Sequence, residues 1–154
     1  MRKSDYTYNI CEMRIKYSTK VPAKERIRIT DSSKLAEVFY RYFDSDSIEL
    51  TEIAYAIITN NNMCVLGIIN IGVGCMDNSV MDMSKAIQAA LLCNGKAIAI
   101  CHNHPSGTLK PSTMDDKTTS DAKKMCDVMK MRLIDHRIIN ADGDYYSYND
   151  NGLL

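Results

Sequence analysis

The sequence predicts a single-domain α/β protein in which helices are layered on a sheet. Three observations favour this fold class. The chain has 154 residues, the length of one domain, and 45% of them are apolar, enough to form a buried core. Short apolar stretches typical of strands alternate with amphipathic stretches typical of helices. A helix also connects a predicted hairpin to a fully apolar strand, as in α/β layer arrangements.

The first half of the chain contains a predicted strand, a helix and a hairpin. Residues 6–17 alternate between apolar and polar side chains, which indicates a strand. Residues 34–43 form a helix with one apolar face, and the Asp-Ser-Ser sequence at 31–33 supplies N-cap candidates. Two apolar runs within 52–72 flank three asparagines at 60–62, so this segment is predicted to be a β-hairpin.

The second half alternates between helices and strands. The elements predicted there are a helix over 84–93, an apolar strand over 96–101, a helix from 111 to about 131, and closing strands over 132–139 and 145–148. Asn94-Gly95 is typical of a helix C-cap. Pro105 and Gly107 mark the segment after the apolar strand as a loop.

Charge and cysteine content narrow the functional classes. The 19 basic and 19 acidic residues give a net charge of zero, which provides no electrostatic basis for sequence-independent DNA binding. The six cysteines lie mostly in apolar surroundings and form no C-x-x-C pair, which favours reduced, buried thiols in a cytosolic protein. No signal peptide and no apolar run of membrane-spanning length is visible, so we expect a cytoplasmic protein without a membrane partner.

One cluster of residues indicates metal chemistry. His102 and His104 directly follow the apolar strand, and side chains two residues apart on an extended backbone point to the same side. Asp115 lies close by, in the first turn of the next predicted helix. Two imidazoles and a carboxylate give Zn²⁺ three protein ligands and leave a fourth position for water, which is a catalytic arrangement.

A zinc site of this kind also needs a group that moves protons. Zinc lowers the pKa of a bound water towards neutrality, and a carboxylate outside the ligand set usually takes and returns the proton. Glu52 is the candidate, because it is an acidic residue at the start of an apolar strand.

Each of these residues also has a purely structural interpretation. His-x-His alone is a weak signal, because histidines often bond to loop carbonyls. Ser112 and Asp115 match a capping box, which explains both without a metal. Glu52 is also compatible with an exposed charge at a strand start. Asp135-His136 could form a second site, although a histidine on a strand is more often a core residue or a partner of a metal ligand.

The spacing of the motifs resembles a known family. His102-x-His104-Pro105, then seven residues, then Ser112-x-x-Asp115, with an upstream Glu52, resembles the JAMM (MPN/JAB) metalloprotease signature. Three longer motifs are similar to the bacterial RadC family in particular: residues 99–107 with Lys110-Pro111-Ser112, residues 133–139, and the closing Tyr145-Tyr146-Ser147 with Gly152-Leu153-Leu154. The resemblance runs from about residue 48 to the end.

This resemblance implies a fold, a cofactor and residue roles. It implies a mixed sheet flanked by helices in the three-layer arrangement of cytidine deaminases, with Zn²⁺ at the sheet edge. It implies His102, His104 and Asp115 as zinc ligands, Glu52 as the general acid/base, and Ser112 as a group that stabilises the oxyanion. The family spacing selects Asp115 and not the neighbouring Asp116. We expect a single domain over residues 1–154, with 1–47 a less certain N-terminal extension packed on it.

The sequence leaves more than one function open. The first is a zinc-dependent hydrolase that cleaves an amide or isopeptide bond, with a peptide or another amide as substrate. The alternative is a non-catalytic module that keeps the fold and acts in protein interaction or in association with DNA, as the DNA-repair label of the RadC family suggests. We expect this chain to lack the N-terminal helix-hairpin-helix module of full-length RadC proteins, because its length leaves no room for one. Deamination ranks lower, because the Cys-x-x-Cys of zinc deaminases is absent.

Overall fold

The computed structural model describes residues 14, 16–18, 20–74 and 81–154. Its elements, in chain order, are the 3₁₀ turn η1 (Ala23–Glu25), α1 (Ser32–Tyr40), β1 (Ile53–Thr59), β2 (Val65–Val73), α2 (Met83–Leu92), β3 (Ala97–Asn103), α3 (Thr113–Val128), β4 (Arg132–Ile139) and β5 (Tyr145–Ser147). The predicted α/β class is confirmed.

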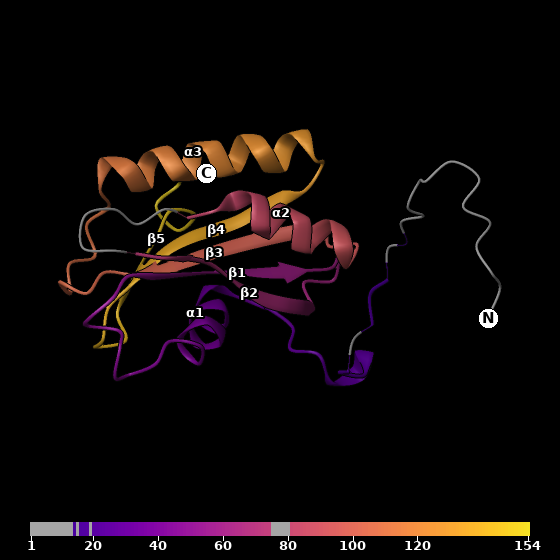
Figure 1. The fold of residues 1–154 in the computed structure, drawn as a ribbon, viewed down its shortest axis with the longest axis horizontal. Coiled ribbons are helices and arrows are strands. Elements are labelled where there is room, and N and C mark those ends of the chain that lie inside the picture. The colour runs from indigo at the N-terminus through magenta and orange to yellow at the C-terminus, as the bar shows by residue number, and fades with distance from the viewer. Residues whose placement is uncertain (1–13, 15, 19, 75–80) are drawn as a thin grey trace, which may run out of the picture.

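The five strands form one mixed sheet in the order β2-β1-β3-β4-β5. β1 pairs antiparallel with both β2 and β3, β3 pairs parallel with β4, and β5 closes the sheet antiparallel to β4. Helices α2 and α3 cover one face and α1 covers the other, so three layers are visible in Figure 1. The mixed sheet flanked by helices, which the family resemblance implied, is confirmed.

Strand β3 lies at the centre of the sheet, and all seven of its residues are buried. Ile98 and Ile100 belong to the hydrophobic cluster beneath α2 and α3, whereas Ala99 and Cys101 belong to the cluster beneath α1. Successive strand residues point to opposite faces, so a strand covered on both faces is apolar throughout. The same alternation places the next residue, His102, on the face covered by α2 and α3.

The helices begin and end where the sequence provides caps. Asp31 accepts a hydrogen bond from the amide of Lys34 at 2.8 Å and caps α1. After α2, Asn94 takes a left-handed conformation with φ of 53°, and the Gly95 amide bonds to the Ala90 carbonyl at 2.7 Å. These two contacts satisfy backbone groups that a helix end leaves open.

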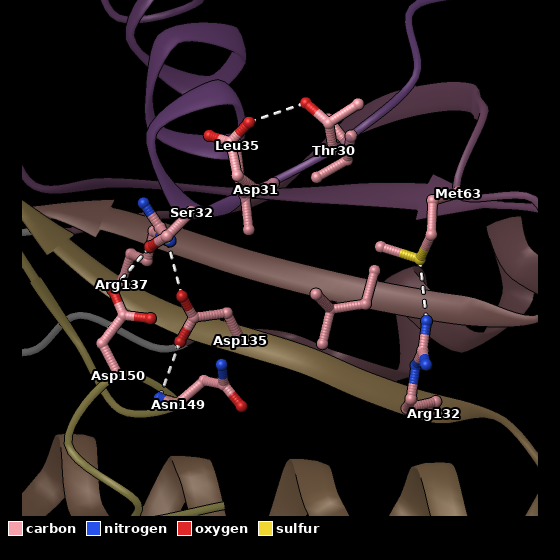
Figure 2. A pocket seen from close by; sticks show the side chains of 12 residues that line it. Thr30, Asp31, Ser32, Leu35, Met63, Arg132, Asp135, Arg137, Asn149 and Asp150 are labelled. Carbon is pink, nitrogen blue, oxygen red and sulfur yellow. Dashed lines mark hydrogen bonds and ion pairs between the residues drawn. The ribbon is translucent and has the colours of Figure 1, made fainter.

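A buried polar network fastens α1 and the C-terminal turn to β4, as Figure 2 shows around a surface cavity of about 280 Å³. The Arg137 Nε donates to Asp135 at 2.6 Å, and its Nη2 donates to the Ser32 hydroxyl. Ser32 in turn donates to Asp150 at 2.5 Å, and the Asn149 amide donates to the other oxygen of Asp135 at 3.0 Å. The buried carboxylate therefore pairs with the guanidinium, as a charge in a core must, although Arg137 Nη1 has no hydrogen-bond partner.

The structure corrects several predicted boundaries. The predicted strand over 96–101 extends through Asn103, so His102 lies within β3 and not in the loop after it. The helix predicted over 34–43 ends at Tyr40, and the long helix runs over Thr113–Val128. Most of the strand predicted over 6–17 lies outside the described residues.

Two further findings concern the described residues alone. Cys64, Cys93, Cys101 and Cys126 carry free thiols. Within the described part of the chain, none of the helices combines the length and the apolar character that crossing a bilayer requires.

The packing of α1 generates a stability prediction. Phe39 is fully buried in the cluster under α1, so Phe39→Ala should lower the free energy of unfolding by about 3–5 kcal/mol. Urea denaturation measures the change. Leu50→Ala is the control, since Leu50 is 78% exposed and its truncation should cost less than about 0.5 kcal/mol. Equal, small losses in both variants would mean that α1 is not part of the cooperative core.

Candidate metal centre

The predicted metal ligands meet where β3 ends and α3 begins. His102 is the sixth residue of β3, and its side chain is fully buried. His104 follows the strand and its side chain is 13% exposed. Asp115, in the first turn of α3, is buried. The site therefore has rigid elements on two sides and an opening at His104.

The three side chains converge on one point. His102 Nε2 lies 2.9 Å from His104 Nε2 and 3.1 Å from Asp115 Oδ1, and His104 Nε2 lies 3.5 Å from Asp115 Oδ2. One ligand atom from each residue lies within 4.8 Å of the other two. Ligand atoms of a tetrahedral zinc site with bonds of ~2.0–2.1 Å are about 3.3 Å apart, so these separations fit a single ion.

The proton on His104 can be placed by its hydrogen bond. Its Nδ1 lies 2.8 Å from the Thr108 carbonyl oxygen, which can only accept, so Nδ1 carries the hydrogen. In the neutral ring, Nε2 then presents a lone pair towards Asp115, whose carboxylate is also an acceptor. Two acceptor atoms that face each other at 3.5 Å repel, so a cation or a proton between them would stabilise the arrangement.

The pKa values of the cluster reflect this arrangement. Burial opposes the charge of Asp115, but its contacts with the rings of His102 and His104 outweigh burial and hold its pKa well below the usual range. Burial also disfavours protonated His104. The hydrogen bonds of its ring to Asp115 and to the Thr108 carbonyl outweigh that effect, so the pKa of His104 is raised. The site therefore attracts positive charge.

Glu52 lies immediately before β1, on the same side of the sheet as the cluster. Ala54 pairs with His102 in the β1–β3 register, and Glu52 continues the alternation of Ala54, Ala56 and Ile58, which pack beneath α2. Its negative charge contributes to the raised pKa of His104, so the two residues are electrostatic neighbours. Glu52 is partly exposed and does not belong to the converging triad.

Asn103 holds the segment of Glu52 in place, a role that the sequence analysis missed. Its fully buried amide nitrogen donates to the carbonyl of Ile48 at 2.6 Å and to that of Thr51 at 2.9 Å. Its amide oxygen accepts from the backbone of Ile53 at 2.7 Å. An asparagine between two histidines reads as a loop residue in the sequence, because nothing local reveals partners fifty residues away.

Ser112 forms the predicted capping box with Asp115. Its hydroxyl accepts from the Asp115 amide at 3.1 Å and donates to Asp115 Oδ2 at 2.6 Å, while the Ser112 amide donates to the same oxygen at 2.7 Å. Ser112 therefore orients a carboxylate of the cluster. Asp116 does not belong to the converging group and accepts from the Tyr148 hydroxyl at 2.7 Å.

The Asp135-His136 pair does not form a second centre, because its two side chains lie on opposite faces of the sheet. Asp135 bonds to Arg137 beneath α1. His136 is fully buried on the other face, with Nε2 at 3.0 Å from Nδ1 of His102 and Nδ1 at 2.6 Å from the Thr119 hydroxyl. His136 thus contacts His102, a residue of the cluster. This fits the interpretation of His136 as a partner of a metal ligand.

Comparison with known proteins finds relatives of this chain. Residues 29–153 match the family described as RadC-like JAB domain, which is most of the chain. The chain belongs to this family. The RadC resemblance inferred from the sequence is confirmed, and the match begins at residue 29, ahead of α1. Assignment of residues 1–28 to the same domain stays a prediction.

Among curated relatives, this RadC-like chain is similar to UPF0758 proteins of several bacteria. It is 32% identical over 141 residues to that of Porphyromonas gingivalis, covering 89% of this chain and 60% of the relative. It is 39% identical over 90 residues to that of Pseudomonas fluorescens, covering 58% of this chain and 40% of the relative. The chain spans about 60% or less of the length of these relatives.

The donor set of this RadC-like domain fits a metal ion. Two imidazole nitrogens and one carboxylate oxygen converge, and the hydrogen bonds of His104 and Asp115 already point their remaining lone pairs at one another. Such outer hydrogen bonds are typical of metal ligands. His102, His104 and Asp115 can therefore hold a divalent metal ion.

The raised pKa of His104 predicts how metal affinity depends on pH. His104 must lose its Nε2 proton to bind a metal, and its pKa lies above the ordinary value of about 6.5. Proton competition should therefore begin at a higher pH than for an ordinary histidine, and affinity should fall as pH decreases. Competition of Co²⁺ or Zn²⁺ with a chelator across pH ~5–8.5 measures this. His104→Ala should bind far more weakly throughout, and a pH-independent affinity would exclude His104 as a ligand.

Proposed function

We propose that this RadC-like domain is a zinc-dependent hydrolase that cleaves an amide or isopeptide bond, and that it acts in the cytoplasm. The observation that carries the proposal is the convergence of His102, His104 and Asp115, with Glu52 beside the cluster but outside it. Three nitrogen and oxygen ligands with one open position are the donor set of catalytic zinc sites. Free thiols at the four described cysteines suit a reducing compartment.

The proposed chemistry divides between the metal and two side chains. When bound, Zn²⁺ supplies Lewis acidity, which lowers the pKa of a water molecule and polarises a carbonyl group. Glu52 takes a proton from the attacking water while the oxygen of that water bonds to the carbonyl carbon of the substrate. Glu52 then gives that proton to the leaving nitrogen as the carbon–nitrogen bond breaks. Ser112 holds Asp115 in position through its amide and its hydroxyl. Its one hydroxyl hydrogen lies on Asp115 Oδ2, so Ser112 becomes a donor to the developing oxyanion only by turning away from that oxygen, which the Ser112 amide still holds.

The test begins with metal content and proceeds to substrate. Protein purified without chelators or metal-affinity steps should contain one zinc per chain. The variant that lacks both His102 and His104 should contain none. Zinc-loaded protein is then assayed against fluorogenic libraries of peptide amides and of isopeptides linked through the lysine ε-amine. Turnover that chelation abolishes and zinc restores supports the proposal. A zinc-loaded protein that cleaves neither library favours a non-catalytic module that binds protein or DNA.

Glu52→Gln separates proton transfer from metal binding. The amide keeps the shape of the side chain and cannot act as a base, so turnover should fall by a factor on the order of 10²–10⁴. Zinc content and melting temperature should stay at wild-type values. Glu49→Gln is the matched control, because Glu49 is exposed three residues earlier and should retain full turnover. Loss of zinc from Glu52→Gln would make Glu52 a ligand and refute its assigned role.

Substitutions of Ser112 distinguish capping from oxyanion stabilisation. Ser112→Ala removes both functions and should cost about 1 kcal/mol of stability. Ser112→Asn keeps an N-cap side chain without a hydroxyl, so its stability should remain close to that of the wild type. If Ser112 stabilises the oxyanion, kcat should fall at least tenfold in both variants with little change in KM. Wild-type kcat in folded Ser112→Asn would reduce the role of Ser112 to that of a cap.

A further inference from the structure

A small cavity lies at the end of the sheet that is remote from the metal centre. It has a volume of about 200 Å³ and is lined by Asn60, Asn61, Lys96, Ala97 and Arg132. The two asparagines belong to the turn between β1 and β2, and the other three residues lie where β3 and β4 begin. His102 lies near the other end of β3, roughly 17 Å from Ala97 at about 3.3 Å per residue. The cavity is therefore separate from the candidate metal ligands.

Backbone pairing holds the segments around this cavity together. The Lys96 amide donates to the Thr59 carbonyl at 2.8 Å, and the Arg132 amide donates to the Lys96 carbonyl at 3.0 Å. Ala97 pairs with Thr59 of β1 on one side and with Arg132 of β4 on the other. The side chains that line the cavity therefore start from strand ends whose relative positions are fixed.

The asparagine turn has engaged its acceptors and kept its donors free. The side-chain oxygen of Asn60 accepts from the amides of Asn62 and Cys64, both at 3.0 Å. The backbone carbonyl of Asn60 accepts from the Met63 amide at 3.0 Å. Because its oxygen is held, the NH₂ group is the free end of the Asn60 side chain. Neither that group nor the backbone amide of Asn61 has a hydrogen-bond partner among the residues that the structure describes.

Two cationic side chains complete the lining, and no carboxylate neutralises either of them. Lys96 Nζ lies 3.1 Å from the side-chain oxygen of Asn94. Arg132 Nη2 lies 2.7 Å from the sulfur of Met63, which is a weak acceptor (Figure 2). Within the described part of the chain, the ion pairs include neither Lys96 nor Arg132. Both side chains are exposed, so a ligand can reach them.

We propose that this cavity binds the phosphate group of a small molecule. Its free donors are an ammonium group, a guanidinium group and the N–H groups of two asparagines, and such a set complements the oxygens of a phosphate. The volume is below the ~300–1,000 Å³ typical of drug-sized ligand sites, so the cavity suits one compact group. Nucleic acid needs many more phosphate contacts than two cations supply. The proposal does not rest on hydrolase activity, because the metal centre lies at the other end of β3.

Titration of the full-length chain with inorganic phosphate, followed by ¹H–¹⁵N NMR at constant ionic strength, tests the site. The backbone amides of Asn61, Lys96 and Arg132 should show the largest shifts, and these should saturate with a Kd of about 1 mM or tighter. Acetate, a carboxylate of the same charge sign, should bind at least about tenfold more weakly. Shifts that stay linear up to about 20 mM phosphate, shifts centred elsewhere, or an equal response to acetate would each overturn the proposal.

Variants that remove one charge locate the bound phosphate. Lys96→Gln and Arg132→Gln should each weaken phosphate binding at least about tenfold, because each loses a charged donor. Lys130→Gln is the matched control, since Lys130 is exposed, lies two residues before Arg132 and does not line the cavity. It should stay within about twofold of the wild type. Melting temperatures confirm that the variants fold, and equal losses in all three would reveal a diffuse positive surface instead of a site.

A short DNA duplex distinguishes the small-molecule site from a surface for nucleic acid. Duplex binding should be weaker than binding of inorganic phosphate per site and should be insensitive to Arg132→Gln. Duplex binding that is tighter than phosphate binding, falls steeply with salt and is lost in Lys96→Gln and Arg132→Gln would reject the small molecule in favour of a nucleic-acid backbone.

Discussion

The register of β3 between β1 and β4 is the constraint on which the centre depends. Side chains of a strand alternate between faces, so a slip of one residue would move His102 beneath α1 and bring Asn103 to the metal face. Two features secure the register. Ile98 and Ile100 fill the core under α2 and α3, and the Asn103 amide is bonded to backbone on either side of Glu52. One strand thus fixes both the packing of the hydrophobic core and the position of His102.

Several buried polar groups in this domain are paired by contacts that also have a structural role. Asp115 belongs to a helix cap and to the ligand cluster at once, so the start of α3 cannot move without displacing the carboxylate. Asp135 and Arg137, on the opposite face, neutralise each other and hold α1 to the strand that carries His136. A buried charge without such a partner would destabilise the fold by several kcal/mol. The candidate ligands are therefore held in place by contacts that do not depend on a metal.

Much of this architecture was predictable from local patterns, and the remainder depends on distant contacts. The hairpin, α2 and the closing strands follow from periodicity and turn residues. The spacing of His102, His104 and Asp115 predicts their proximity, because all three lie within one strand–loop–helix unit. The role of Asn103 was not predictable, since an amide carries no periodic signal. The predicted strand ends at residue 101, two residues before β3 does, because the polar residues that follow are typical of a loop. In the structure, His102 pairs with β1 and β4, and Asn103 pairs with β4.

The non-local assembly of the centre also has a consequence for folding. His102 and His104 are near neighbours in the chain, but Glu52 reaches them only once β1 has paired with β3 across about fifty residues. His136 joins them only through the parallel pairing of β3 with β4, which a helical crossover delays. Contacts of this range form late in folding, because chain entropy must be lost before they contribute. A partly folded or nascent chain therefore lacks the complete constellation, which exists in the native state alone.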